Sequence, residues 1–160
     1  MGMIWEGRAV SAAELARLRT SPEYLWQLRE SGGEPPAVVD LDKAWHALHW
    51  LLAGDDAPTD DVLADAIMGG VGVGEDTGYG PARVLEADRV AEVAAALAPI
   101  DVPWLRARYD PQRLSEAEIY PDIWDEDDVF EEYLAFHFTL LKALYAHAAE
   151  RRCAVVQAIT

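Results

Sequence analysis

The stretch VVDLDKAWHALHWLL, residues 38–52, contains side chains that take part in several kinds of protein chemistry. Asp42, His46 and His49 are spaced so that they share one face if the segment is helical. A carboxylate and two imidazoles could bind a metal ion, and His49 with a nearby carboxylate could act as an acid–base pair. Asp42 could equally cap the helix while both histidines pack against the core. Because no H-E-x-x-H motif is present, we expect no metal and no cofactor.

Two basic side chains lie at positions that call for an anionic partner. Lys43 falls at the start of the helix expected over residues 43–53, where the helix dipole disfavours positive charge. Arg83 follows the glycine-rich segment GGVGVGEDTGYGP, residues 69–81, whose spacing matches neither of the common nucleotide-binding glycine motifs. We therefore expect the segment to form a lid or a tight turn, and Lys43 and Arg83 to contact a ligand. For Arg83, a salt bridge to the chain's own acidic segment is the alternative.

Aromatic side chains occur at the same candidate sites. Tyr120 and Trp124 belong to the segment EIYPDIW, residues 118–124, and Trp45 belongs to the histidine-containing stretch. Such side chains could stack against a ligand or anchor a turn to the core. The predicted ligand-binding set is therefore Lys43, Trp45, His49, Arg83, Tyr120 and Trp124.

Hydrophobic periodicity and capping residues predict the elements that would position these side chains. Strands are expected over residues 3–10, 37–39, 82–85 and 154–159. Ser11 and Glu14 form a capping box, so a helix should begin at Ala12. A second helix should follow Ser21-Pro22, and a third should cover 43–53, with Asp42 as its N-cap and Gly54 as its end. The next helix should begin after a cap at Thr59 or Asp60 and end at Ile67. Further helices are expected over 86–98, 102–108 and 111–117, and a last one from the acidic turn 125–128 to Arg151 and Arg152.

This order of elements predicts a fold class. Short extended segments alternate with helices, helix predominates, and 160 residues suit one domain. We therefore expect a single domain over residues 1–160, of the α/β class or alternatively α+β, in which helices cover a small sheet of short strands.

The composition limits the classes of partner. The chain has 29 acidic and 13 basic residues and a net charge of −16, and residues 110–132 contain ten acidic side chains against the single base Arg113. Nucleic acids and anionic membranes require surplus Lys and Arg, so we expect the protein to bind neither. A basic protein or a cationic ligand would be attracted. A single cysteine, Cys153, and an N-terminal segment without the pattern of a signal peptide indicate a cytoplasmic protein.

Four segments match one known family in order along the chain. They are DKAWHALHWLL (42–52), GYGPARVLEADRVAEVAAAL (78–97), RYDPQRLSEAEIYPDIW (108–124) and the final helix. These segments resemble the YfbM-like family of small bacterial proteins. The family pattern falls on Asp42, Lys43, Trp45, Leu48, His49, Gly80, Pro81, Arg83, Leu85, Tyr109, Asp110, Ile119, Tyr120, Pro121 and Trp124. The resemblance implies one α/β-type domain in a bacterial cytosol, and no particular activity, because the family has no established one.

Three functions are compatible with these features. The first is a non-enzymatic domain that binds a small polar ligand or a peptide through the six residues above, since no nucleophile or metal motif accompanies them. The second is an acidic partner-binding protein of the inhibitor or immunity type, which the net charge favours. The third is an acid–base hydrolase that uses His49 with a carboxylate such as Asp42 or Glu118, provided that a substrate can reach the imidazole.

Overall fold

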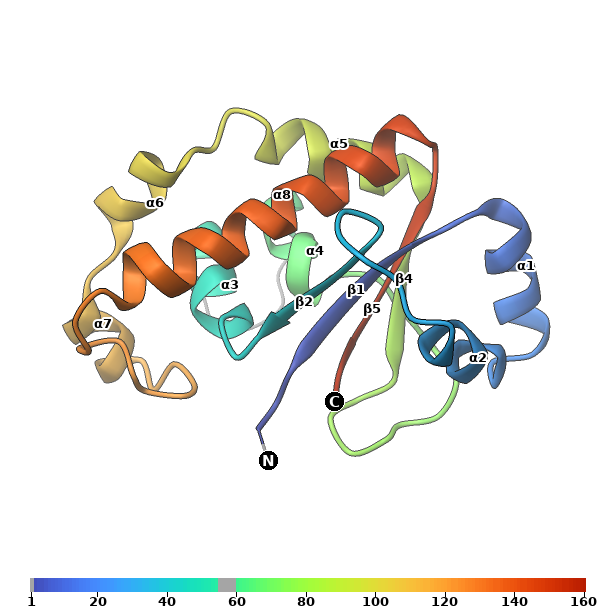
Figure 1. Cartoon of the computed structure of the whole chain (residues 1–160), viewed down its shortest axis with the longest axis horizontal. Helices are drawn as coiled ribbons and strands as arrows, with labels where there is room; N and C mark the ends of the chain where they lie inside the picture. The colour runs from blue at the N-terminus through green and yellow to red at the C-terminus, as the bar shows by residue number, and fades with distance from the viewer. Residues whose placement is uncertain (1, 55–59) are drawn as a thin grey trace.

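A five-stranded sheet forms the centre of the protein, in the order β2-β1-β5-β4-β3. The computed structural model describes residues 2–54 and 60–160. All four neighbouring strand pairs are antiparallel. Strands β1 and β5 lie side by side in the middle, with both chain ends at the same end of the sheet (Figure 1). The strands are β1 (Trp5–Val10), β2 (Val38–Asp42), β3 (Val71–Val73), β4 (Ala82–Leu85) and β5 (Ala154–Ile159).

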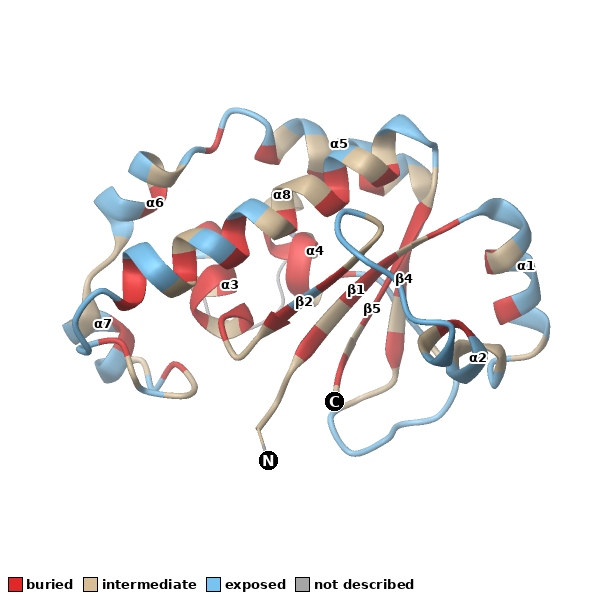
Figure 2. Cartoon of the chain, in the orientation of Figure 1, coloured by how far each residue is buried: buried red, intermediate tan, exposed pale blue. Residues whose placement is uncertain are grey.

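Four helices pack on one face of this sheet and enclose the main core. They are α3 (Trp45–Ala53), α4 (Val62–Met68), α5 (Ala87–Leu97) and α8 (Ala135–Glu150). Side chains at alternate strand positions, such as Trp5, Val155 and Ile159, belong to the same buried cluster as residues of these helices. Figure 2 shows buried residues on all four helices, with exposed residues on α5 and α8 but none on α3 and α4. The predicted helix-rich domain with a small sheet is thus confirmed, and the antiparallel pairing corresponds to the α+β alternative.

Two short helices cover part of the opposite face. Helix α1 (Ala12–Thr20) begins with the predicted capping box, in which Ser11 and Glu14 exchange hydrogen bonds with each other's backbone N–H groups. Helix α2 (Tyr24–Glu30) follows after a short turn. The small core under this pair includes Leu18, Leu28 and Val156. Because α1 and α2 are short, they leave space above Ala82 and Ala158 of the sheet, and these two residues line a hollow described below.

The remaining elements lie at the far end of the helical layer from α1 and α2 (Figure 1). Helix α6 (Val102–Arg108) and helix α7 (Pro111–Glu116) begin at the aspartate caps Asp101 and Asp110. A π-helix, η1 (Val129–Leu134), leads directly into α8. The predicted single long helix is therefore present, but its first turns have the wider π geometry.

The boundary between β2 and α3 differs from the prediction. Asp42 is the last residue of β2, with a positive φ of 47°, and not the N-cap of the helix. Helix α3 begins at Trp45, and its preceding residue Ala44 makes no side-chain cap. Lys43 therefore lies in the connecting turn, directly before the N-cap Ala44, and not inside the helix as predicted. The end of α3 at Gly54 is as predicted.

The structure also differs from the prediction at the start of α4 and in the glycine-rich segment. Asp61 caps α4, with its carboxylate accepting from the Leu63 N–H at 2.7 Å. The cap thus lies one residue after the predicted Asp60, and the other predicted cap, Thr59, lies outside the described residues. Strand β3 lies within the glycine-rich segment, where no strand was expected. Gly70 and Gly74 bound it with φ of 95° and 77°, conformations that favour glycine.

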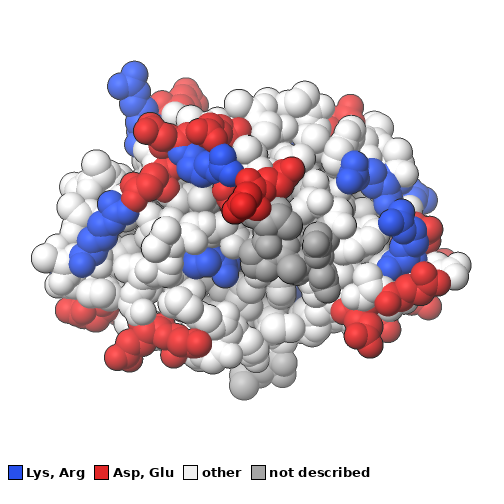
Figure 3. Space-filling model, turned by 180° about the vertical axis from the view of Figure 1, so that it is seen from behind, with Lys and Arg blue, Asp and Glu red and all other residues white. Residues whose placement is uncertain are grey.

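The surface carries acidic and basic side chains next to one another. Figure 3 shows small basic groups with acidic neighbours on the back of the molecule. The described ion pairs include Arg89 with Asp65 and Glu92, each at 2.6 Å, and Arg106 with Glu131 at 3.2 Å. The pair Arg106–Glu131 is largely exposed, so it contributes little to stability. It does give the Arg106 guanidinium a carboxylate partner.

Candidate functional site

Three of the predicted residues meet at the start of the chain. The Met3 N–H donates to the Tyr120 hydroxyl at 3.1 Å, and Trp45 Nε1 donates to the Met3 carbonyl at 3.0 Å. A side chain at Gly2 would collide with both Lys43 Cε and the Tyr120 hydroxyl, so these two side chains enclose the glycine. Lys43, Trp45 and Tyr120 thus surround residues 2–3 of the same chain.

A half-buried phenol, that of Tyr133, connects this region to α8 through η1. The Tyr133 hydroxyl donates to Asp42 Oδ2 at 2.8 Å and accepts from the Lys43 N–H at 3.0 Å. Burial raises the pKa of Tyr133, and the hydrogen bond to the Asp42 carboxylate raises it further. The phenol therefore stays protonated and holds Asp42 at the end of β2. His46 takes part in the same region, because its Nδ1 accepts the Tyr120 N–H at 3.0 Å.

Two other predicted residues lie inside the core. His49 and Trp124 both have an exposed fraction of 0%. Trp124 Nε1 donates to the Ile119 carbonyl at 2.8 Å, and its own carbonyl accepts from the Tyr109 hydroxyl. These bonds anchor the turn 118–124 to the core. A buried imidazole is not accessible to a substrate, so His49 lacks the exposure that the hydrolase hypothesis requires.

Arg83 holds backbone atoms at the end of α4. Its Nε donates to the Gly69 carbonyl at 3.2 Å and its Nη2 donates to the Ile67 carbonyl at 3.0 Å. Burial lowers the pKa of the guanidinium. Within the described residues Arg83 forms no ion pair, so in place of the salt bridge considered as the alternative it makes hydrogen bonds to carbonyl groups.

Arg83 is one of four side chains that satisfy the carbonyl groups at the C-terminus of α4. Each comes from a different element: β1, β4, β5 and α8. The other three bonds run from Trp5 Nε1 to Ile67 at 2.9 Å, from Gln157 Nε2 to Gly69 at 2.7 Å and from Tyr145 to Ala66 at 2.7 Å. Because a helix leaves its last carbonyl groups without internal partners, this clamp removes a large cost of burying the end of α4.

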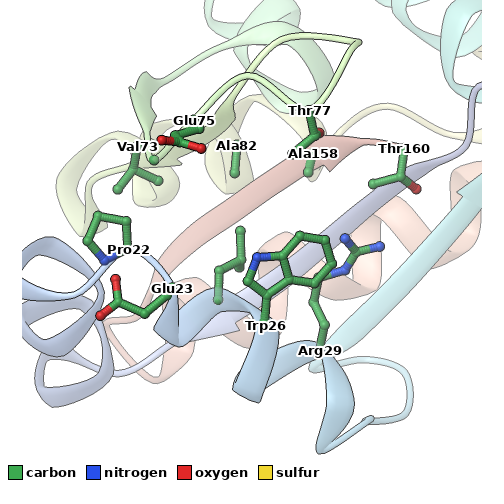
Figure 4. A pocket seen from close by; sticks show the side chains of 12 residues that line it. Pro22, Glu23, Trp26, Arg29, Val73, Glu75, Thr77, Ala82, Ala158 and Thr160 are labelled. Atoms are coloured by element: carbon green, nitrogen blue, oxygen red, sulfur yellow. The ribbon is translucent and has the colours of Figure 1, made fainter.

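A hollow of about 470 Å³ opens on the face of the sheet that α1 and α2 cover incompletely. We call it the sheet-face hollow. Ala82 and Ala158 form its floor, where small side chains leave space above β4 and β5 (Figure 4). Trp26 and Arg29 from α2 form one wall, and the loop after β3, with Glu75, forms the opposite wall.

Trp26 is unusual in this hollow because it presents a large apolar surface to solvent. Its side chain has an exposed fraction of 58% although it lies beside a concave surface. The Arg29 guanidinium lies over the indole at 5.6 Å from the ring centre, and its Nε lies 3.9 Å from Glu6 Oε1. Glu23 and Glu75 line the same hollow and form no ion pair within the described residues. The hollow therefore combines an aromatic face with unneutralised carboxylates.

The sequence did contain a signal for this site. Tyr24, Leu25 and Leu28 follow the apolar stripe of α2, and they face the small core. Trp26 lies off that stripe, on the polar side of the helix. A tryptophan on the polar side of a short helix indicates a contact outside the core. This position, off the apolar stripe, could have marked Trp26 as a candidate binding residue.

Over residues 2–54 and 60–160, no group of three or more His, Cys, Asp or Glu side chains is arranged to hold a metal ion. None of the helices in that part of the chain has the length and apolar character needed to span a membrane.

Comparisons with known proteins place the chain in a family. The sequence profile described as "Domain of unknown function (DUF1877)" matches residues 1–158. The crystal structure of YfbM, a protein of unknown function from Escherichia coli, superposes with a TM-score of 0.74 at 22% identity, over 99% of this chain and 100% of that one. At this identity the likeness shows a shared fold. The search of curated proteins returned no match. Because the profile spans nearly the whole chain, the protein belongs to the DUF1877 family of YfbM-like proteins.

Proposed function

We propose that the protein is a non-enzymatic binding domain and that the sheet-face hollow is its binding site. The observation that carries this proposal is the exposed Trp26 indole beside a floor of small residues. Exposed aromatic surface on a concave wall is typical of ligand recognition. A volume of about 470 Å³ lies within the usual range for small-molecule sites, roughly 300–1,000 Å³.

The charges around the hollow favour a cationic ligand. Glu23 and Glu75 contribute two carboxylates, while Arg29 lies near Glu6. The face of an indole attracts cations, and carboxylates form strong hydrogen bonds with ammonium and guanidinium groups. The net charge of −16 would attract such a ligand from a distance. We infer a small polar ligand or a peptide segment that carries an Arg-like or Lys-like group, in the cytoplasm that the single cysteine suggests.

The residues predicted from the sequence support this site indirectly. Trp45, Arg83, Tyr120 and Trp124 each use a polar side-chain atom to bond the backbone of the same chain. His49 is buried in α3. In the proposed function these residues hold the fold that presents the hollow, and the ligand contacts Trp26 and the two glutamates.

The proposal can be tested by titrating ¹⁵N-labelled protein with arginine amide and with a short arginine-containing peptide. We expect saturable shifts in residues 22–29 and 73–77, which Trp26→Ala abolishes and Glu75→Gln weakens. Phe136→Ala is the matched control, because Phe136 on α8 has nearly the same exposed fraction, 57%, and does not line the hollow. Equal binding by Trp26→Ala and the unchanged protein would refute the proposal.

An acidic partner-binding role remains the second candidate. The turn Asp125–Asp128 carries four consecutive exposed carboxylates. A basic protein could dock there through charge, and such binding weakens with salt. Replacing the four acids by Asn or Gln should then reduce capture of a basic partner protein at low salt, whereas Trp26→Ala should leave it unchanged. The reverse pattern would favour the hollow.

A further inference from the structure

A second hollow lies on the helical side of the protein, where α3, α6 and α7 meet. Its volume is about 510 Å³. Trp50 and Gly54 at the end of α3 form one side, and residues 107–111 with Arg113 form the other. We call it the arginine hollow, because Arg108 and Arg113 both line it. None of its lining residues belongs to the sheet-face hollow, so the two sites are separate.

Each of these arginines is held by an indole. The Arg108 guanidinium lies 4.4 Å from the centre of the Trp104 ring, and the Arg113 guanidinium lies 5.2 Å from the centre of the Trp50 ring. Arg108 also approaches Gly54, since a side chain at that glycine would lie 3.9 Å from Arg108 Nη2. Stacking on an aromatic ring orients the planar guanidinium while its N–H groups at the edge stay available.

Neither arginine forms an ion pair with any described carboxylate. The arginines Arg19, Arg29, Arg89 and Arg106 all do, in a chain where acidic residues outnumber basic ones by 29 to 13. The nearby Asp110 uses its carboxylate to accept from the N–H groups of Gln112 and Arg113 as the cap of α7. Among its described lining residues, the hollow therefore has two guanidinium groups, each near an indole, and one carboxylate that already has partners.

We propose that the arginine hollow binds small molecules that carry an oxyanion group, a phosphate or a carboxylate. Paired guanidinium groups suit these groups because their N–H donors match two oxygens at once. The exposed part of Trp50 adds an apolar surface for the rest of the ligand. The overall negative charge repels polyanions, so the ligand is a small molecule with a localised charge and not a nucleic acid. Figure 3 shows basic side chains, with acidic neighbours, on the side of the molecule that carries α6 and α7.

The experiment uses the full chain and four probes at matched ionic strength: inorganic phosphate, phenyl phosphate, acetate and benzoate. Binding is followed by ¹H–¹⁵N shifts of residues 107–113 and of the Trp50 indole. We expect saturable shifts with at least one probe class, and tighter binding by the aromatic member of that class. The comparison of phosphates with carboxylates then identifies which oxyanion the site prefers.

Variants decide whether the arginines carry the binding. Arg108→Gln and Arg113→Gln should each weaken binding by about tenfold, as expected for a lost hydrogen bond between charged groups. Arg106→Gln is the matched control, because Arg106 lies on the same helix and pairs with Glu131. Thermal melts check folding, and Arg113→Lys, which retains the charge, should bind more weakly than the unchanged protein but more tightly than Arg113→Gln. Absence of saturable shifts with all four probes, or unchanged binding by both glutamine variants, would overturn the proposal. Neither result would affect the sheet-face hollow, which has different residues.

Discussion

Tyr145 has an ionisable side chain that lies entirely inside the core, with an exposed fraction of 0%. Its hydroxyl donates to the Ala66 carbonyl at 2.7 Å, and this bond requires the proton. Burial raises the pKa of the phenol, and the Asp65 charge raises it further, while Arg83 lowers it slightly. The folded protein therefore retains this proton at a pH where an unfolded chain releases it.

This retention predicts a loss of stability in alkaline solution. The contribution of Tyr145 is fully present below the unfolded pKa of about 10 and decreases as the pH rises above it. The limiting slope for one group is about 1.4 kcal/mol per pH unit. In Tyr145→Phe, the unfolding free energy should be lower by about 1 kcal/mol at neutral pH and should fall less steeply above pH ~10.

Urea unfolding from neutral pH to pH ~11 measures both effects. The half-exposed Tyr24 offers a control, because Tyr24→Phe should keep the steep alkaline decrease of the unchanged protein. If the Tyr145→Phe curve ran parallel to that of the unchanged protein, the phenol would not be the group that retains the proton.

The predicted ligand-binding residues show what residue types and spacing reveal and what they do not. Lys43, Trp45 and Tyr120 do meet in space, as a shared site requires, but they enclose Gly2 and Met3. Residue type alone does not tell whether a polar atom bonds a ligand or the backbone. Those bonds join residues more than forty positions apart, and only the folded chain reveals them.

Among the secondary-structure elements, those with strong local patterns were predicted well. Strand β4, helix α6 and strand β5 have the expected bounds. Pro81 precedes β4 and the cap Asp101 precedes α6, while β5 is the apolar run AVVQAI after the basic end of α8. The capping box of α1 is likewise present. Strand β3 was missed because Val71–Val73 contains a glycine and lies among others, which weakens any strand pattern.

The start of α3 was predicted wrongly for a different reason. Asp42 has the type and position of a helix cap, but the Tyr133 hydroxyl, contributed by η1, binds its carboxylate. The local preference for a cap is overridden by a contact between residues 91 positions apart in the chain. Similarly, the π geometry of η1 has no signal in the hydrophobic pattern that predicted the long final helix.

The clamp at the end of α4 gives a prediction for one variant. Arg83→Ala removes two hydrogen bonds from a charged donor, although the Ile67 carbonyl keeps its bond from Trp5 and the Gly69 carbonyl keeps its bond from Gln157. We expect the free energy of unfolding to fall by about 2 kcal/mol. Arg151→Ala, at an exposed position after α8, should change it by less than about 0.5 kcal/mol.

Urea denaturation compares the unfolding free energies of the two variants. Titrations with arginine amide and with phosphate measure their binding. Arg83→Ala should bind both probes as the unchanged protein does while folded, since Arg83 lines neither hollow. Normal stability combined with lost binding would show that Arg83 contacts a ligand after all.

The charge of the whole molecule gives the last prediction. A net charge of −16 on 160 residues makes the folded state repel itself, and few exposed ion pairs among the described residues offset that repulsion. Salt shortens the range of this repulsion from about 30 Å at ~0.01 M to about 8 Å at ~0.15 M. The urea midpoint should therefore rise over that range of sodium chloride. Potassium chloride should raise the urea midpoint by the same amount as sodium chloride. A urea midpoint that falls with added salt would mean that attraction between opposite charges outweighs the repulsion.

The sheet ends in two strands that each discourage further pairing. At one edge, β2 carries the exposed Asp40 and the half-exposed Asp42; at the other, β3 is three residues long between glycines. Charges and short, bent strands are known to prevent edge-to-edge association. The hydrophobic strands β1 and β5 are thereby shielded in the centre. The acidic residues of β2 therefore protect the protein from fibrillar aggregation when it is concentrated.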